Sequence, residues 1–238
     1  MAATLEPRQN VRAMLRQRSF PWRSSLRVLV AQRGAISHLH LSEQPPHSIA
    51  LPDAGQIEVQ IRAAGLNFKD VLNVLNELPS RFLTPIGDDC AGLITAVGTG
   101  VRRTLRRGVA VFGTIEGCLD TFVRARGCAL HVVKLPTAVS ALEACTMPAV
   151  WCTVHQVLKR AAPRALQQSL LHAAVGGIGL VAVEYARWLC LATVGTAGGP
   201  PKHAVLAQLG VPVRLSSRSP QAFALGVARR SRGGRVDL

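Results

Sequence analysis

The sequence predicts a chain in two parts, a mostly β domain followed by an α/β domain built on a doubly wound parallel sheet. Three observations predict this. Short apolar segments recur at hairpin-like intervals over residues 27–136, separated by Gly, Pro or charged pairs. From Ser140 the pattern changes to long helical periods that alternate with single strands. A glycine cluster at 174–179 joins a short apolar strand to a helix, as in the first βα turn of such a sheet.

Continuous or alternating apolar residues predict the strands of the first part. A polar, Pro-containing loop is expected over Ser42–Asp53, and a short helix near Asn67–Leu75. The domain boundary is expected near Leu135-Pro136, which gives domains over 27–136 and 137–238. The expected strands are Leu26–Ala31, Ile57–Ile61, Gly92–Val97, Val109–Phe112, Cys118–Val123 and Leu130–Lys134.

The second part begins with a β-α-β unit. An apolar strand at Ser169–Leu171 leads through Ala174-x-Gly176-x-x-Gly179 into a helix at Ile178–Trp188, and a second apolar run follows at Leu191–Gly195. Such a turn brings backbone N–H groups and the positive end of a helix close to a pyrophosphate. The unit therefore predicts dinucleotide binding. The alternative is that the glycines only allow close helix-to-strand packing.

The residues after the second strand indicate which dinucleotide is bound. Binders of the unphosphorylated dinucleotide usually carry an acid there, and none occurs between Thr193 and Val213. The segment Thr196–His203 offers instead a hydroxyl and the cation of Lys202, which suit a 2′-phosphate. NADPH is therefore the expected cofactor. An ordinary solvated lysine at a helix start is the alternative for Lys202.

Composition excludes two classes of function. The net charge is +15, but the excess is almost all Arg, scattered in pairs, and aromatic residues for base stacking are scarce. We therefore expect no nucleic-acid binding, and interpret the charge as solvated arginine or as a face toward an acidic partner. No apolar run approaches the roughly 20 residues of a membrane span.

The six cysteines lack C-x-x-C spacing, which predicts free thiols in a reducing compartment such as the cytoplasm. Residues 1–26 are rich in Arg and Ser. They suit either an organelle transit peptide or a loose linker.

Several ordered motifs resemble one family. IEVQIRAAGLNFKDVLNVL at 57–75, GDDCAGLITAVGTGV at 87–101, the glycine turn and LHVVKLP at 130–136 are similar to the medium-chain dehydrogenase/reductase superfamily, in particular to enoyl reductase domains of polyketide and fatty acid synthases. The resemblance implies a GroES-like β domain followed by a Rossmann-type domain. It implies NADPH as cofactor, and as partners an acyl-carrier-protein-bound enoyl thioester or other synthase domains.

The resemblance also implies site residues. Lys202 falls on the 2′-phosphate contact, with Thr196 and Arg218 as weaker candidates. Asn67 and Thr153 match positions that face the nicotinamide, and Asn67 also suits a helix N-cap. The pyrophosphate loop is matched by Ala174, Gly176, Gly177, Ile178 and Gly179.

The sequence departs from the family pattern in its catalytic groups. Zinc-dependent relatives place Cys and a His-Glu pair where this chain has Asn67 and Asp88-Asp89, so a zinc-free protein is expected. A Tyr that can protonate the α-carbon in many relatives aligns with Leu78, which cannot donate a proton. No catalytic residue is assigned.

Relatives continue beyond the point where this sequence stops. The third strand near Val213–Ser216, and a strand beginning at Val236, are therefore expected to leave an unpaired sheet edge. We expect a partial enoyl reductase unit, which is a fragment of a larger synthase, an incomplete gene model or a decayed paralogue. Activity in isolation, the acyl substrate and the oligomeric state stay open.

Three functions remain as hypotheses. The first is an NADPH-dependent enoyl reductase-type module that saturates an enoyl thioester. The second is a stand-alone zinc-free quinone or enone oxidoreductase acting on small substrates. The third is a catalytically silent scaffold that holds NADPH or a neighbouring domain.

Overall fold

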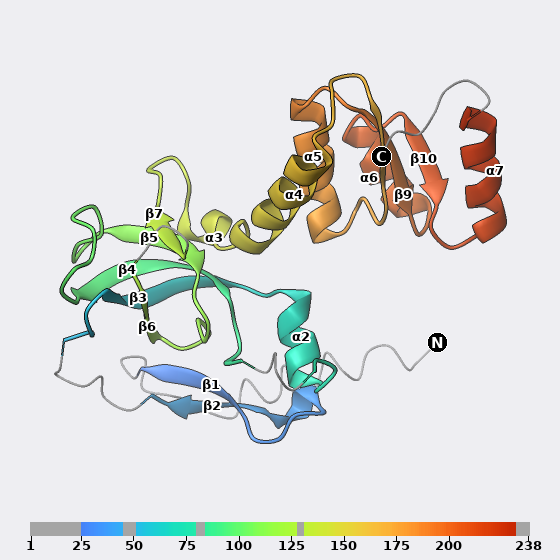
Figure 1. Ribbon diagram of the computed structural model, residues 1–238. Coiled ribbons are helices and arrows are strands. Elements are labelled where there is room, and N and C mark those ends of the chain that lie inside the picture. Colours follow the sequence, from blue (N-terminus) through green and yellow to red (C-terminus); the bar gives the residue numbers. More distant parts are fainter. Residues whose placement is uncertain (1–24, 45–50, 80–83, 128–130, 232–238) are drawn as a thin grey trace. The chain divides into compact units, whose positions relative to one another are not determined.

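The computed structural model describes residues 25–44, 51–79, 84–127 and 131–231 of the chain (Figure 1). It divides into two compact units, residues 1–145 and 146–238. The stretch 137–145 packs with the first unit, and the predicted domain boundary itself stays a prediction. Among the described helices, none has the length and apolar character that crossing a bilayer requires. The Arg-rich segment 1–26 lies almost wholly outside the described residues, as does the strand expected from Val236.

The first unit is built on a five-stranded antiparallel sheet with the order β6-β3-β4-β5-β7 (Figure 1). Its longest pair joins β3 to β4, whose register shifts between Glu58 and Val59 and again between Ile61 and Ala63. Inward side chains such as Ile57, Val59 and Ile94 are fully buried and form the core. The strands are β3 (Gln56–Gly65), β4 (Asp89–Val97), β5 (Ala110–Thr114), β6 (Phe122–Arg126) and β7 (Val132–Lys134).

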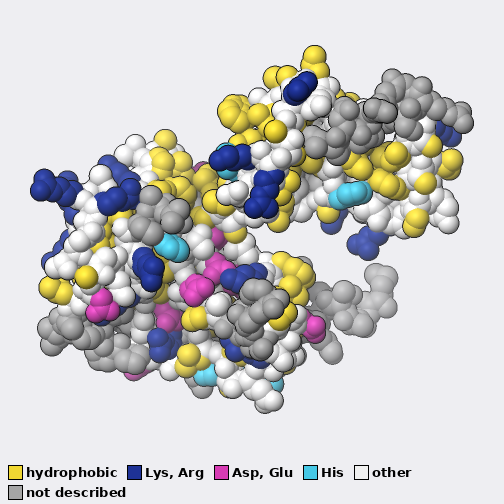
Figure 2. Space-filling model, viewed as in Figure 1, with side chains coloured by type: hydrophobic (Ala, Val, Ile, Leu, Met, Phe, Trp, Pro, Cys, Tyr) yellow, Lys and Arg dark blue, Asp and Glu magenta, His cyan; other side chains and the backbone are white. Residues whose placement is uncertain are grey.

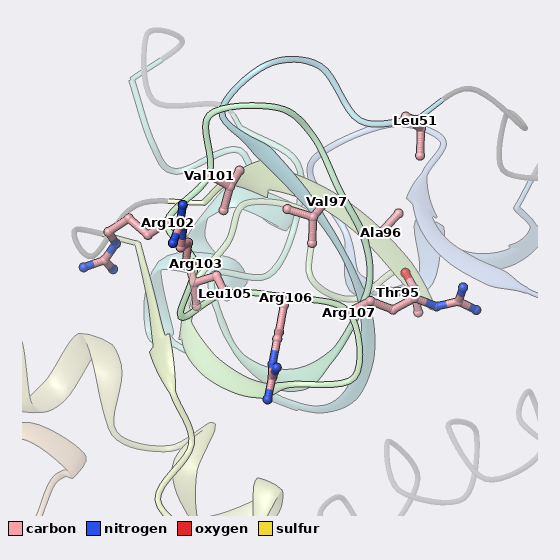
Figure 3. Close-up of a pocket in the computed structure, with 10 residues that line it drawn as sticks. All are labelled: Leu51, Thr95, Ala96, Val97, Val101, Arg102, Arg103, Leu105, Arg106 and Arg107. Carbon is pink, nitrogen blue, oxygen red and sulfur yellow. The ribbon is translucent and has the colours of Figure 1, made fainter.

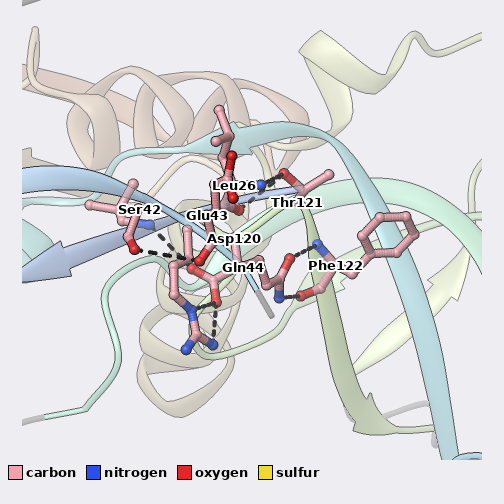
Figure 4. A network of polar contacts seen from close by, with 9 residues as sticks. Leu26, Ser42, Glu43, Gln44, Asp120, Thr121 and Phe122 are labelled. Atoms are coloured by element: carbon pink, nitrogen blue, oxygen red, sulfur yellow. Dashed lines mark hydrogen bonds and ion pairs between the residues drawn. The ribbon is translucent and has the colours of Figure 1, made fainter. Parts of the chain in front are cut away.

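A separate hairpin of β1 (Leu26–Val30) and β2 (Leu39–Glu43), linked by a 3-10 turn at Ile36–His38, is tied to the segment before β6 (Figure 4). Thr121 N–H donates to the Leu26 carbonyl at 2.7 Å, and Gln44 Nε2 donates to the Phe122 carbonyl at 2.7 Å. The strand β2 includes Ser42 and Glu43, which the sequence assigned to a loop. That assignment was wrong because pairing with β1 satisfies their backbone groups whatever the polarity of their side chains.

Two short helices belong to this unit. The helix α2 (Phe68–Val74) begins at the N-cap Asn67, as predicted, and α3 (Ala141–Ala144) begins at Ser140. The strand expected over Cys118–Val123 starts later, at Phe122, because Cys118 lies in a turn, where its side chain is completely buried. An apolar run can therefore fill a buried turn as well as a strand.

The second unit holds a three-stranded parallel sheet with the order β10-β9-β8, flanked by helices (Figure 1). Its core joins Ala174, Val183 and Leu206. The strand predicted at Val213–Ser216 is confirmed, whereas the strand expected to end at Gly195 continues through Thr196 and Ala197. The elements are α4 (Pro148–Ala161), β8 (Gln168–Leu171), α5 (Gly177–Trp188), β9 (Ala192–Ala197), α6 (Pro200–Gln208), β10 (Val213–Ser216) and α7 (Pro220–Ser231).

Candidate functional site

The glycine loop leads from the end of β8 into α5. Ala173 has a φ of 50°, in the left-handed region that non-glycine residues rarely adopt. Its carbonyl accepts the Gly176 N–H at 2.8 Å, which closes the turn, and Gly176 is the extended N-cap of α5. The first N–H groups of a helix have no partner within it. Gly176, Gly177 and Ile178 are exposed, so the loop presents this helix end to solvent.

The glycines of the loop have different local roles. A Cβ on Gly179 would overlap the Ala173 carbonyl oxygen and lie 2.6 Å from the Ala174 Cα, so close packing of α5 on the loop requires glycine there. A Cβ on Gly177 would meet only Val150 Cγ1 at 3.9 Å, which is ordinary contact. Packing alone therefore explains Gly179 but not Gly177. An open surface at Gly177 suits the close approach of a ligand to the backbone.

Thr196 holds the glycine loop from the neighbouring strand. Its side chain is fully buried, and its hydroxyl oxygen accepts the Ala173 N–H at 3.0 Å. Its carbonyl accepts the Ala174 N–H at 2.9 Å. The sequence placed Thr196 beyond the strand as a phosphate contact. Its burial within β9 favours a role in fastening the loop instead.

Two cations flank the end of β9. Lys202 is exposed in the first turn of α6, and Arg218 is exposed in the loop after β10. Ser217 N–H donates to the Ala197 carbonyl at 3.0 Å, and Arg218 Nε would lie 3.2 Å from a Cβ on Gly198. No ion pair between described residues involves either cation. This edge of the sheet therefore offers two unneutralised positive charges beside a pair of glycines.

The described residues fit a phosphorylated dinucleotide. The backbone N–H groups at the exposed start of α5 can donate hydrogen bonds to a diphosphate. A helix N-terminus also carries partial positive charge, which favours an anion there. Lys202 and Arg218, near the end of the adjacent strand, can accept a further phosphate. His203, which the sequence did not single out, lies at the same edge and contacts the Ala197 carbonyl through Nε2 at 3.2 Å.

Asn67 and Thr153 belong to different units, so their joint role at a nicotinamide stays a prediction. Asn67 caps α2, where its N–H donates to the Asp70 carboxylate at 2.9 Å, and its side-chain Nδ2 is buried with no partner among the described residues. Thr153 is exposed on α4, and its hydroxyl donates to the Ala149 carbonyl at 2.6 Å. Among the described residues, the Asn67 amide is therefore a buried donor without a hydrogen-bond acceptor.

Asp88, which is expected at one of the zinc-ligand positions of zinc-dependent relatives, forms an ion pair here. Lys69 Nζ lies 2.7 Å from the Asp88 carboxylate, and this hydrogen bond raises the pKa of Lys69 despite partial burial. Within the described part of the chain, no group of three or more His, Cys, Asp or Glu is placed to bind a metal ion. Leu78, which aligns with the proton-donating Tyr of relatives, is half-buried.

The thiols of Cys90 and Cys118 are both buried in the core of the first unit. A hydrogen bond to Cys90, together with burial, raises the pKa of Cys118 well above its ordinary value. The thiol of Cys118 also donates to the Asp89 carbonyl at 3.4 Å. Cys118 is therefore a neutral packing residue rather than a nucleophile.

Comparison with known proteins identifies the family. No protein-family model matches the chain. A reducing polyketide synthase of Metacordyceps chlamydosporia, rdc5, is 32% identical over 219 residues, which are 90% of this chain and 9% of that protein. Erythronolide synthase EryA2 of Saccharopolyspora erythraea is 34% identical over 212 residues, 88% of this chain and 6% of that protein. The chain therefore spans about a tenth or less of these curated relatives.

Solved structures agree with these relatives. The CurK enoyl reductase superposes with a TM-score of 0.79 and 29% identity, over 90% of this chain and 65% of that one. The Escherichia coli quinone oxidoreductase, solved in complex with NADPH, superposes with a TM-score of 0.77 and 25% identity, over 88% of this chain and 64% of that one. The chain therefore has the fold of these oxidoreductases, with a GroES-like part and a Rossmann-like part that holds the glycine loop. The chain belongs to the medium-chain dehydrogenase/reductase superfamily, as a homologue of polyketide synthases with enoyl reductases among its structural neighbours.

Proposed function

We propose that the chain is an NADPH-dependent enoyl reductase-type module that saturates the α,β double bond of an enoyl thioester. The observation that carries this proposal is the exposed start of α5 together with the unneutralised Lys202 and Arg218 at the end of the adjacent strand. The polyketide synthase relatives and the enoyl reductase neighbours support the reaction type.

Different groups of the chain bind different parts of NADPH in this proposal. Backbone N–H groups at Gly176–Ile178 receive the diphosphate, and Thr196 holds the loop that presents them. Lys202 and Arg218 bind the 2′-phosphate of NADPH. NADH is disfavoured because the segment between Thr193 and Val213 has no acid to bind a free ribose 2′-hydroxyl. When bound, NADPH supplies the hydride for the β-carbon of the polarised double bond.

The proton for the α-carbon comes from a group other than Leu78, since a leucine carries no exchangeable proton. The free Nδ2 of Asn67 is a donor suited to hold a carbonyl or carboxamide oxygen in place. The acyl group arrives on an acyl carrier protein or on another synthase domain, as the multidomain relatives suggest.

An assay of NADPH oxidation with two acceptors tests the proposal. We expect a crotonyl thioester to be reduced and a simple quinone to be a poor acceptor. The opposite preference would instead establish a quinone oxidoreductase, the second candidate, which the quinone oxidoreductase neighbours support. Tight binding of NADPH without turnover of either acceptor would support the third hypothesis, a catalytically silent scaffold.

A further inference from the structure

The loop between β4 and β5 carries two arginine pairs on either side of a buried leucine. Its sequence, Arg102-Arg-Thr-Leu-Arg-Arg107, contains four arginines and no acid; we name Arg102, Arg103, Arg106 and Arg107 the arginine loop. All four side chains are exposed. Figure 2 shows dark-blue side chains gathered at the end of the first unit where this loop lies in Figure 1.

The backbone of the arginine loop is held in place. The Leu105 side chain is 3% exposed and packs in the main core cluster with Val101 and Val109 against it. Leu105 N–H donates to the Arg102 carbonyl at 2.9 Å, and Val109 N–H donates to the Arg106 carbonyl at 3.0 Å. The arginines therefore start from fixed positions, which lowers the entropy lost when they bind a partner.

The arginines border an open hollow of about 670 Å³ (Figure 3). Its floor is apolar and is made by Ala96, Val97 and Val101 with Leu105. Thr95 also lines it, and its hydroxyl donates to Glu58 at 2.9 Å. That carboxylate already pairs with Arg124, so it does not neutralise the arginine loop. The hollow combines an apolar centre with a basic rim.

The directions of the side chains decide which ligand fits. In Figure 3, Arg102, Arg106 and Arg107 point away from one another rather than into the hollow. A single small anion therefore cannot contact them all, whereas carboxylates spread over a folded surface can. No ion pair between described residues involves these arginines, so no carboxylate of the described part of the chain compensates their mutual repulsion.

We propose that the arginine loop and its hollow are a docking surface for an acidic protein domain, which inserts one apolar side chain and surrounds it with carboxylates. An apolar centre inside a charged rim is the usual anatomy of a protein interface, where arginine is enriched. Nucleic acid fits less well because no aromatic side chain lines the hollow among the described residues, and the arginines that line it all come from one loop. The surface belongs to the first unit and the dinucleotide loop to the second.

The test measures binding of a labelled helical peptide, with one central Leu ringed by Glu at helical spacing, to the full chain by fluorescence anisotropy. The variant Arg102→Ala/Arg103→Ala/Arg106→Ala/Arg107→Ala removes the rim. Lys159→Ala/Arg160→Ala is the control, since it removes two exposed charges from α4. We expect binding to the parent chain, at least about tenfold weaker binding to the quadruple variant, and little change in the control.

Three results with peptides would overturn the proposal: no binding of the peptide, equal loss in the control variant, or equal binding of a peptide with Gln in place of Glu. A single-stranded oligonucleotide that binds more tightly than the peptide, and loses affinity in the quadruple variant, would overturn it in favour of nucleic acid. NADPH affinity of the same variants is measured in parallel. It is expected to be unchanged, so failure here is distinguishable from failure of the proposed function.

Discussion

At the scale of the residue, the site depends on a backbone conformation that its side chain does not favour. Ala173 adopts a left-handed φ of 50°, and two hydrogen bonds that Thr196 accepts from the turn hold it against the adjacent strand. Strained residues of this kind persist only where their surroundings hold them. The contact between β9 and the loop therefore positions the amides that would receive a diphosphate.

The first prediction concerns that contact. Thr196→Val removes the acceptor for the Ala173 N–H, so we expect a loss of about 1–3 kcal/mol of unfolding free energy and weaker NADPH binding. Thr196→Ser keeps the hydroxyl and should restore most of both. Urea unfolding and NADPH titration measure the two effects. Equal affinities for all three proteins would show that Thr196 does not position the loop.

The second prediction concerns cofactor preference. Lys202→Ala and Arg218→Ala should each weaken NADPH binding by roughly tenfold and leave NADH binding unchanged, because each removes a charge-assisted contact to the 2′-phosphate alone. Isothermal titration with both cofactors checks this. Lys159→Ala serves as the matched control, since Lys159 is likewise exposed on a helix. A parallel loss for NADH would place these cations elsewhere on the cofactor.

At the scale of the element, two glycines of the loop allow the effects of packing and of ligand binding to be measured separately. Gly179→Ala should destabilise the second unit by about 1–3 kcal/mol, because its Cβ meets backbone atoms that cannot move aside. Gly177→Ala has room for its Cβ and should leave stability nearly unchanged while weakening NADPH binding. Thermal unfolding and titration compare the pair. If Gly177→Ala bound NADPH normally, the exposed helix start would not be the diphosphate site.

The helix α3 yields a prediction about pH. Ser140 N–H donates to the Glu143 carboxylate at 2.9 Å, and the Ser140 hydroxyl accepts the Glu143 N–H at 3.2 Å. The bond from the Ser140 N–H, together with a second bond that the Ser140 hydroxyl donates to the same carboxylate at 2.7 Å, lowers the pKa of Glu143 in the folded chain. Its contribution to stability is therefore present above the ordinary pKa of 4.5 and lost as pH falls through the lowered value. Glu143→Gln should flatten this acid dependence of the melting temperature, and an unchanged profile would contradict the capping role.

At the scale of the whole molecule, two compact units imply two responses to ligand. A ligand that binds only the folded second unit stabilises it by mass action, by about 2.7 kcal/mol at a hundredfold excess over Kd. We expect calorimetry with NADPH to raise the unfolding transition of that unit most, and to raise that of the first unit less, since only Asn67 is proposed to contact the cofactor there. NADH at the same concentration should shift it less. A shift of neither transition, in folded protein, would refute cofactor binding.

Much of this architecture could be predicted because it follows from local pattern. The strand at 213–216, the capping of α2 by Asn67 and the order of β8, α5 and β9 are confirmed. The errors arose where burial came from distant neighbours. Cys118 is buried although it lies in a turn, and β2 continues through polar residues because β1 pairs with it. The local periodicity of apolar residues reveals neither the burial of Cys118 nor the pairing of β2 with β1.

The amino-acid sequence by itself determined the two-part order of elements, the family, and the absence of an acid after the second strand of the β-α-β unit, since each is a property of consecutive residues. Only the tertiary structure decided that Thr196 faces inward to the loop and that Arg218 lies beside Gly198. It also decided the left-handed turn at Ala173. The physical reason is that these properties depend on which strands pair and what they bury, and such contacts join residues far apart along the chain.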